Sequence, residues 1–221
     1  IGKKQSSVGY YGLIRQSFID YAGEIVASSE RLSQSLVDPV AASKLAVADV
    51  LLRAAAVPCD TLSLEFQWFC DETVPGATDD LSHIIHKVYK EVSLQTSALV
   101  CESKVSSKHG IDVEQDGKNY RAILPPSCII SLSANVKDVR RYTTSYVENK
   151  QTGAKLIWCD LQEGEHNLAG TVLNQNDDKY GDKVAKVDLK AIEKWVKNLQ
   201  QWVANDKILA YQPVGQGGLI Y

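Results

Sequence analysis

Five residues near the C-terminal end combine positive charge with large aromatic rings at helical spacing: Lys190, Lys194, Lys197, Trp195 and Trp202. The lysines share one face of a helix predicted over residues 188–205, and the tryptophans belong to its opposite, apolar face. A basic amphipathic helix with tryptophan can contact phosphates, lie on an anionic membrane or anchor a protein partner. An ordinary surface helix with its apolar face in the core is nevertheless favoured, because Asp188 and Glu193 dilute the charge.

Histidine is the next residue type that could perform chemistry, and the chain has four. His83 and His86 lie three residues apart on a predicted helix, so both can face one direction. A zinc site needs at least one further ligand, which the spacing does not provide. A histidine folded beside a serine or cysteine would make a hydrolase-like site, but the sequence contains neither a nucleophile elbow nor a cysteine-protease signature. We therefore expect no metal and no cofactor, and we assign no catalytic residue.

Composition limits the classes of function. The net charge of −3 argues against nucleic-acid binding over the whole surface, and no apolar run is long enough for a membrane span. The five cysteines are odd in number, widely spaced and never in a CxxC pair, which favours free thiols and an intracellular protein. No apolar stretch of a signal peptide follows the first residues, although a start without methionine leaves room for a removed leader.

The elements that would position these residues follow from the period of the apolar pattern. Apolar residues recur at helical spacing up to about residue 100, alternate from residue 111 to about 173, and return to helical spacing over 188–205. The predicted helices cover residues 10–37 and 40–56, a segment that begins at Thr78, and residues 188–205. The predicted strands cover residues 61–70, 128–134, 139–147, 154–161 and 168–173, and a hairpin over 111–124 has Asp116-Gly117 at its tip.

This order of elements predicts an α+β fold, in which N-terminal helices and a C-terminal amphipathic helix pack on an antiparallel sheet of about five strands. We expect one domain over residues 1–221. A sub-boundary near residues 105–110 would separate a helix-rich part, 1–105, from a strand-rich part, 106–221. Within this fold, Trp195 and Leu199 are expected to pack in the core and the three lysines to reach solvent.

The absence of an active-site motif favours a non-catalytic structural or protein-interaction protein, such as a self-assembling coat-type subunit. Such a protein would form a homo-oligomer or bind a protein partner. Two alternatives stay open. One is a hydrolase-like enzyme with a histidine brought beside a serine or cysteine by folding. The other is a membrane-active protein that uses the basic tryptophan helix over 188–205.

Overall fold

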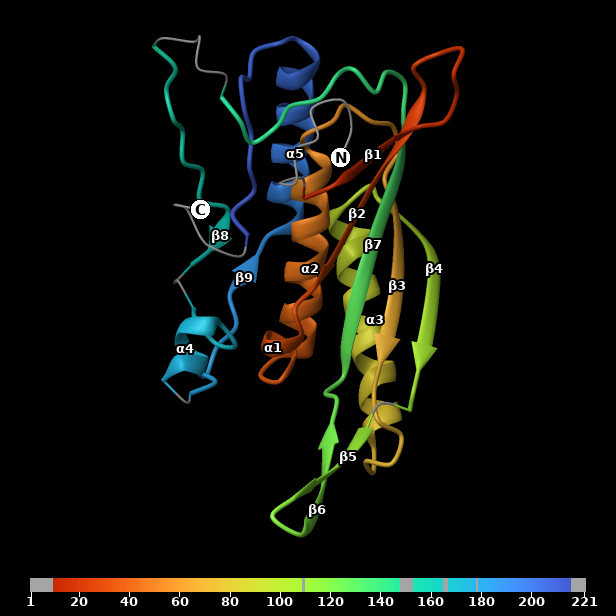
Figure 1. Ribbon diagram of the computed structural model, residues 1–221, viewed down its shortest axis with the longest axis vertical. Helices are drawn as coiled ribbons and strands as arrows, with labels where there is room; N and C mark the ends of the chain where they lie inside the picture. Colours follow the sequence, from red (N-terminus) through yellow and green to blue (C-terminus); the bar gives the residue numbers. More distant parts are fainter. Residues whose placement is uncertain (1–9, 109, 148–152, 165–166, 178, 216–221) are drawn as a thin grey trace.

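A sheet of five strands with helices on one of its sides forms the main body of the chain (Figure 1). A computed structural model describes residues 10–108, 110–147, 153–164, 167–177 and 179–215. The strands of the main sheet are β1 (Gly12–Arg15), β2 (Gly23–Glu30), β3 (Ser63–Phe69), β4 (Leu99–Ser106) and β7 (Ser127–Val136). The shorter strands are β5 (Gly110–Gln115), β6 (Lys118–Ile123), β8 (Gln162–Glu163) and β9 (Lys186–Val187). The helices are α1 (Leu32–Ser35), α2 (Pro39–Ala54), α3 (Ala77–Gln95), α4 (Val172–Asn176) and α5 (Leu189–Ala204).

The strand order in the main sheet is β1-β2-β7-β3-β4. All neighbours are antiparallel except β3 and β4, which run parallel because helix α3 between them returns the chain to the same end of the sheet. The predicted α+β class is confirmed, but the sheet is mixed rather than antiparallel. Strand β7 lies between β2 and β3, so residues from both sides of the predicted 105–110 boundary share one sheet. That the whole chain forms a single domain stays a prediction.

The helix predicted over residues 10–37 is wrong. This segment forms the β1–β2 hairpin followed by the short helix α1. Within β2, Ile25 and Ala27 are buried whereas Ser28 is exposed, which is the alternation of a strand. Phe18 has the helical spacing of the apolar residues in this segment, but its side chain is fully exposed in the connection between the two strands. The apolar residues of the two strands and of their connection therefore have helical spacing by coincidence.

Helix α2 begins where the sequence predicts it. The Asp38 carboxylate accepts hydrogen bonds from the backbone N–H groups of Val40 and Ala41, both at 3.0 Å, and Pro39 occupies the first helical position. The helix packs its small and branched residues on β2 and β7. On β3, Phe66 and Trp68 are buried on the same side of the sheet, with ring centroids 5.6 Å apart. These contacts form the core between the helices and the sheet.

The β5–β6 hairpin is confirmed with its tip at the predicted dipeptide, where Asp116 and Gly117 both have positive φ. It projects beyond the end of the main sheet (Figure 1). A side-chain contact holds its base: the Arg121 Nε donates to the Asp71 carboxylate at 3.2 Å. Asp71 is itself buried, and its Oδ1 also accepts from the hydroxyl of Thr73 at 2.6 Å. The Thr73 hydrogen bonds, followed by Arg121, hold the pKa of Asp71 below its usual range.

The second half contains fewer strands than predicted. The described residues of 139–147 and 154–161 are irregular, and 168–173 forms a turn that leads into α4. The backbone N–H of Thr143 donates to the carbonyl of Ala56, and that of Tyr211 donates to the carbonyl of Thr144. The segment 139–147 therefore pairs with a helix end and a loop instead of with a neighbouring strand. Apolar alternation indicates one buried face and does not identify a hydrogen-bond partner. In 154–161 that face is not buried, because Leu156 and Ile157 are exposed.

Helix α5 is confirmed close to its predicted bounds and packs mainly on α2. Leu199 is buried in the core as predicted, and the side chains of Lys190, Lys194 and Lys197 are exposed. Trp195 was expected in the core, but this prediction is wrong. Its side chain is half-buried at the border of the helix's apolar face. Among the described helices, none is long and apolar enough to cross a lipid bilayer.

Replacing Leu199 by alanine should cost about 3 kcal/mol of unfolding free energy, because it leaves a cavity between α5 and α2. Trp202→Ala on the same helix should cost roughly 1 kcal/mol or less, because that ring is already 38% exposed. Urea denaturation followed by circular dichroism measures both losses. A larger loss for Trp202→Ala would contradict this packing of α5.

Acidification should loosen the β5–β6 hairpin through Asp71. Because the folded-state pKa of this carboxyl is lowered, its stabilising charge is present at neutral pH and is lost as the pH falls below the ordinary aspartate range. Amide hydrogen exchange of β5 and β6 should therefore accelerate in acid, relative to the main sheet. Asp71→Asn should loosen the hairpin already at neutral pH, whereas Asp116→Asn at its tip should not. Equal exchange in both variants would contradict the role of the Asp71–Arg121 contact.

Candidate functional site

One side of the main sheet carries no described helix (Figure 1). The residues of β2, β3 and β7 that alternate with the buried ones point to this side and are mostly polar. The register places Ser28 of β2 opposite Ser131 of β7, and Ser131 opposite Glu65 of β3. Residues directly opposite each other on one face lie roughly 5 Å apart. Two hydroxyls and a carboxylate therefore form a continuous row across three strands. Ser133 of β7, opposite Val26, extends this polar surface along the strand.

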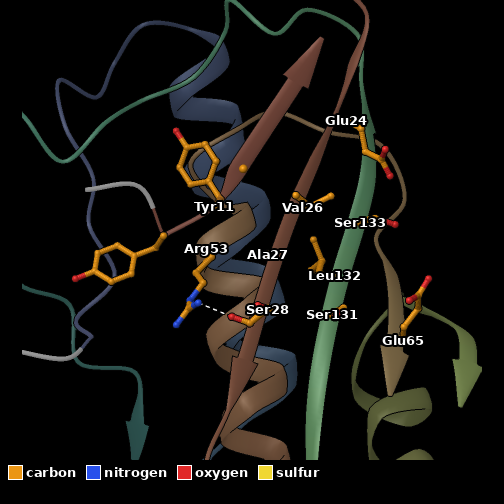
Figure 2. Close-up of a pocket in the computed structure, with 12 residues that line it drawn as sticks. Tyr11, Glu24, Val26, Ala27, Ser28, Arg53, Glu65, Ser131, Leu132 and Ser133 are labelled. Atoms are coloured by element: carbon orange, nitrogen blue, oxygen red, sulfur yellow. Dashed lines mark hydrogen bonds between the residues drawn. The ribbon is translucent and has the colours of Figure 1, made fainter. Parts of the chain in front are cut away.

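The row lies in a hollow of about 660 Å³ on this side of the sheet (Figure 2). Its polar lining comes from β2, β7, β3 and α2: Glu24, Ser28, Arg53, Glu65, Ser131 and Ser133. Figure 2 shows the serines side by side on the strands, with the glutamates on one flank and Arg53 on the other.

Arg53 is held at the rim of the hollow by a charge cluster around Asp49. The Oδ2 atom of Asp49 accepts from the Ser29 hydroxyl at 2.6 Å, from Arg31 at 2.8 Å and from Arg53 at 3.2 Å. Arg53 also donates to the backbone carbonyl of Ser28, on a part of β2 that β1 does not pair (Figure 2). The Nε atoms of both arginines are buried without a hydrogen-bond partner. Two guanidinium groups therefore share a single carboxylate, which leaves positive charge at this rim.

Two tyrosines border the same rim. The ring of Tyr10 lies under the Arg53 guanidinium, with 5.7 Å between the guanidinium carbon and the ring centroid. Tyr11 donates its hydroxyl to the backbone carbonyl of Thr143 at 2.8 Å. Burial, with a smaller contribution from Tyr142, raises the pKa of the Tyr11 phenol. Tyr11 is therefore a neutral anchor for the neighbouring segment and not a general base.

The chemistry of the hollow suits binding more than catalysis. Serine hydroxyls donate and accept hydrogen bonds, and the two carboxylates accept them, so hydroxyl and amide groups of a ligand can be paired. An anionic group of a ligand would be repelled by Glu24 and Glu65 and attracted to the Arg53 rim. Among the described residues, no group of three or more His, Cys, Asp and Glu could hold a metal ion.

The residues singled out from the sequence lie elsewhere. Lys190, Lys194, Lys197, Trp195 and Trp202 are on α5, and none lines the hollow. His83 and His86 are exposed on α3, and His109 and His166 lie outside the described residues. The residues of the hollow carried only one signal in the sequence, which is the polar half of each alternating strand. That signal predicts a solvent-facing side and contains no information about its shape.

Residues 1–135 match the family described as the FGAR-AT PurM_N-like domain. The match begins before β1 and ends at the last but one residue of β7. It therefore includes nearly the whole main sheet, helices α2 and α3, and every residue that lines the hollow. Helix α5 and the irregular segments that precede it lie beyond the match.

Solved structures with a similar fold have low sequence identity to this chain. PurL of Thermotoga maritima complexed with FGAR is 12% identical and has a TM-score of 0.59. The alignment covers 97% of this chain and 32% of that chain. PurLQS from Thermotoga maritima is 13% identical, with a TM-score of 0.47 over 62% and 21% of the two chains. A HypE–HypF complex is 14% identical, with a TM-score of 0.45 over 81% and 56%. The chain thus spans 32% or less of the PurL chains it resembles.

Asp49→Asn should destabilise the fold by about 3 kcal/mol, because it leaves two largely buried guanidinium groups without a counter-charge. Asp206→Asn is the matched control, since it breaks the exposed pair with Arg141 and should change the unfolding free energy by less than about 1 kcal/mol. Chemical denaturation measures both values. Similar small losses would show that the cluster does not depend on the Asp49 charge.

Proposed function

The chain belongs to the FGAR-AT PurM_N-like domain family, and from this premise we propose that it acts as one domain of a larger FGAR-AT enzyme and binds FGAR at its sheet hollow. The observation that carries the proposal is the coincidence of the family match with the hollow: all lining residues fall within residues 1–135. The similar PurL structure, which shares the fold over nearly the entire chain, is a complex with FGAR.

This membership corrects the function expected from the sequence. A non-catalytic, self-assembling coat-type subunit is wrong, because the chain belongs to a family of domains named after FGAR-AT. The expectation rested on the absence of a recognisable catalytic motif. A domain that contributes only part of a binding surface needs no such motif, because the chemistry can be completed by groups elsewhere in a longer protein.

In the proposed role, the chain binds and orients and does not itself supply a nucleophile. Ser28, Ser131 and Ser133 would pair hydroxyl or amide groups of the ligand, and Glu65 would accept from them. Arg53 would attract an anionic part of the ligand to the rim while its other donors keep it on Asp49 and Ser28. Catalysis by the longer protein would then depend on segments that this chain does not contain.

Titration calorimetry with FGAR tests the proposal on the purified chain. We expect saturable binding, which should weaken at least tenfold in Ser131→Leu because leucine fills the middle of the polar row and removes a hydroxyl. Ser131 points away from the helices, so this variant should keep its fold by circular dichroism.

The matched control is Ser103→Leu, an exposed serine of β4 that lies outside the hollow. It should bind FGAR as the unmodified chain does. Two results would contradict the proposal: no saturable binding by the folded chain, or equal binding by both leucine variants.

A further inference from the structure

The charges in the sheet hollow are unevenly distributed. Its two carboxylates, Glu24 and Glu65, lie on one flank and Arg53 lies on the other (Figure 2). Among the described residues, no lysine, arginine or histidine lies within ion-pair distance of Glu24 or Glu65. At the opposite flank, Arg53 shares the Asp49 carboxylate with Arg31, so its positive charge is only partly neutralised. The hollow therefore has a positive end and a negative end.

Glu65 is the carboxylate at the end of the polar row. Arg53 contacts the first member of this row, because it donates to the backbone carbonyl of Ser28 on β2. The row then crosses Ser131 on β7 and ends at Glu65 on β3. Neighbouring strands are about 4.8 Å apart, so the two steps from β2 to β3 cover roughly 10 Å. A ligand of that length with an anionic end at Arg53 would have its far end at Glu65.

Glu24 has the same charge but lies away from this row. It precedes Ser28 by four residues on β2, which corresponds to about 13 Å along the strand. The screening length of salt is roughly 8 Å at physiological ionic strength. The charge of Glu24 therefore has little effect on a ligand that follows the row.

A second carboxylate beside Glu65 is neutralised by its own strand. The register places Glu102 of β4 directly opposite Glu65, and like charges at opposite positions destabilise a sheet. Glu102 is paired with Lys104 at 3.0 Å, whereas Glu65 has no such partner among the described residues. The charge that a ligand meets at this end of the row is therefore that of Glu65. Such a local cost to the sheet is typical of functional positions.

We propose that Glu65 is a specificity-determining residue of the hollow: it allows a ligand with one anionic end to bind and excludes a ligand that is anionic at both ends. The inference rests on the proposed function, since it takes the hollow as the ligand site. Each terminal nitrogen of Arg53 donates one N–H, to Ser28 or to Asp49, and has a second N–H that can point to an anion. At the far end, the Glu65 carboxylate accepts hydrogen bonds from hydroxyl or amide groups and repels a second anion. The ligand therefore has one preferred orientation in the hollow.

Two sugar phosphates serve as probes, because they differ in the charge of the far end. Ribose 5-phosphate has one anionic end and a body of hydroxyl groups, whereas fructose 1,6-bisphosphate is anionic at both ends. Titration calorimetry with the purified chain at physiological salt measures the affinity of each. We expect ribose 5-phosphate to bind more tightly than the bisphosphate, by about fourfold, because a second phosphate lies close to the Glu65 carboxylate.

Glu65→Gln should shift the ratio of the two affinities about fourfold in favour of the bisphosphate, because it removes the repelling charge and keeps the shape of an exposed side chain. Glu24→Gln should shift the ratio by less than about twofold, since that carboxylate lies away from the row. Glu114→Gln is the matched control. It removes the same charge from an exposed position on β5, outside the hollow, and should leave the ratio unchanged. Circular dichroism verifies that each variant is folded.

Several outcomes would overturn the inference. They are no binding of ribose 5-phosphate by the folded chain, equal binding of the two probes by the unmodified chain, an unchanged ratio in Glu65→Gln, and an equal shift in Glu65→Gln and Glu24→Gln. The FGAR titration is a separate measurement. Saturable FGAR binding together with any of these outcomes would refute the role of Glu65 and leave the proposed function standing. Absent FGAR binding together with the expected ratios would refute the proposed function alone.

Discussion

Helix α2 packs on only one side of the main sheet, and much of the remaining structure depends on this one-sided contact. Ala46, Val47, Val50 and Ala54 of the helix are all buried, and their small or branched side chains allow close approach to β2 and β7. Because successive strand residues point to opposite sides, this packing leaves Ser28 and its counterparts on β7 and β3 without cover. The hollow and the core are therefore two consequences of the same strand alternation.

The elements with a strong local signal were predictable from the sequence. The Asp38-Pro39 pair marks the start of α2, Asp116-Gly117 has the positive φ values that a two-residue turn requires, and the alternation of residues 61–70 identifies β3. The β1–β2 hairpin was missed because both periods fit its apolar residues. Choosing between them requires the pairing of β2 with β7, whose residues lie about a hundred positions later in the chain.

The candidate site was not predictable for a related reason. Ser28, Glu65 and Ser131 come from three separate strands, and each is an ordinary outward residue in its own segment. Only the register, which places Ser131 opposite both of the others, brings them into one row. Arg53 is likewise an ordinary helical arginine until Asp49 and the Ser28 carbonyl fix it at the rim. The α5 residues were easier to identify because one helix holds them all, although the helical period could not tell that Trp195 stays outside the core.

We propose that this PurM-like domain binds FGAR on the uncovered side of its sheet. The most direct test is a heteronuclear NMR titration of the folded chain with FGAR, in which the amide signals of individual residues are followed. We expect the signals of Ser28, Glu65 and Ser131 to shift together and saturate, while those of α5 stay in place. Unchanged signals throughout the sheet, or shifts confined to residues outside the hollow, would contradict it.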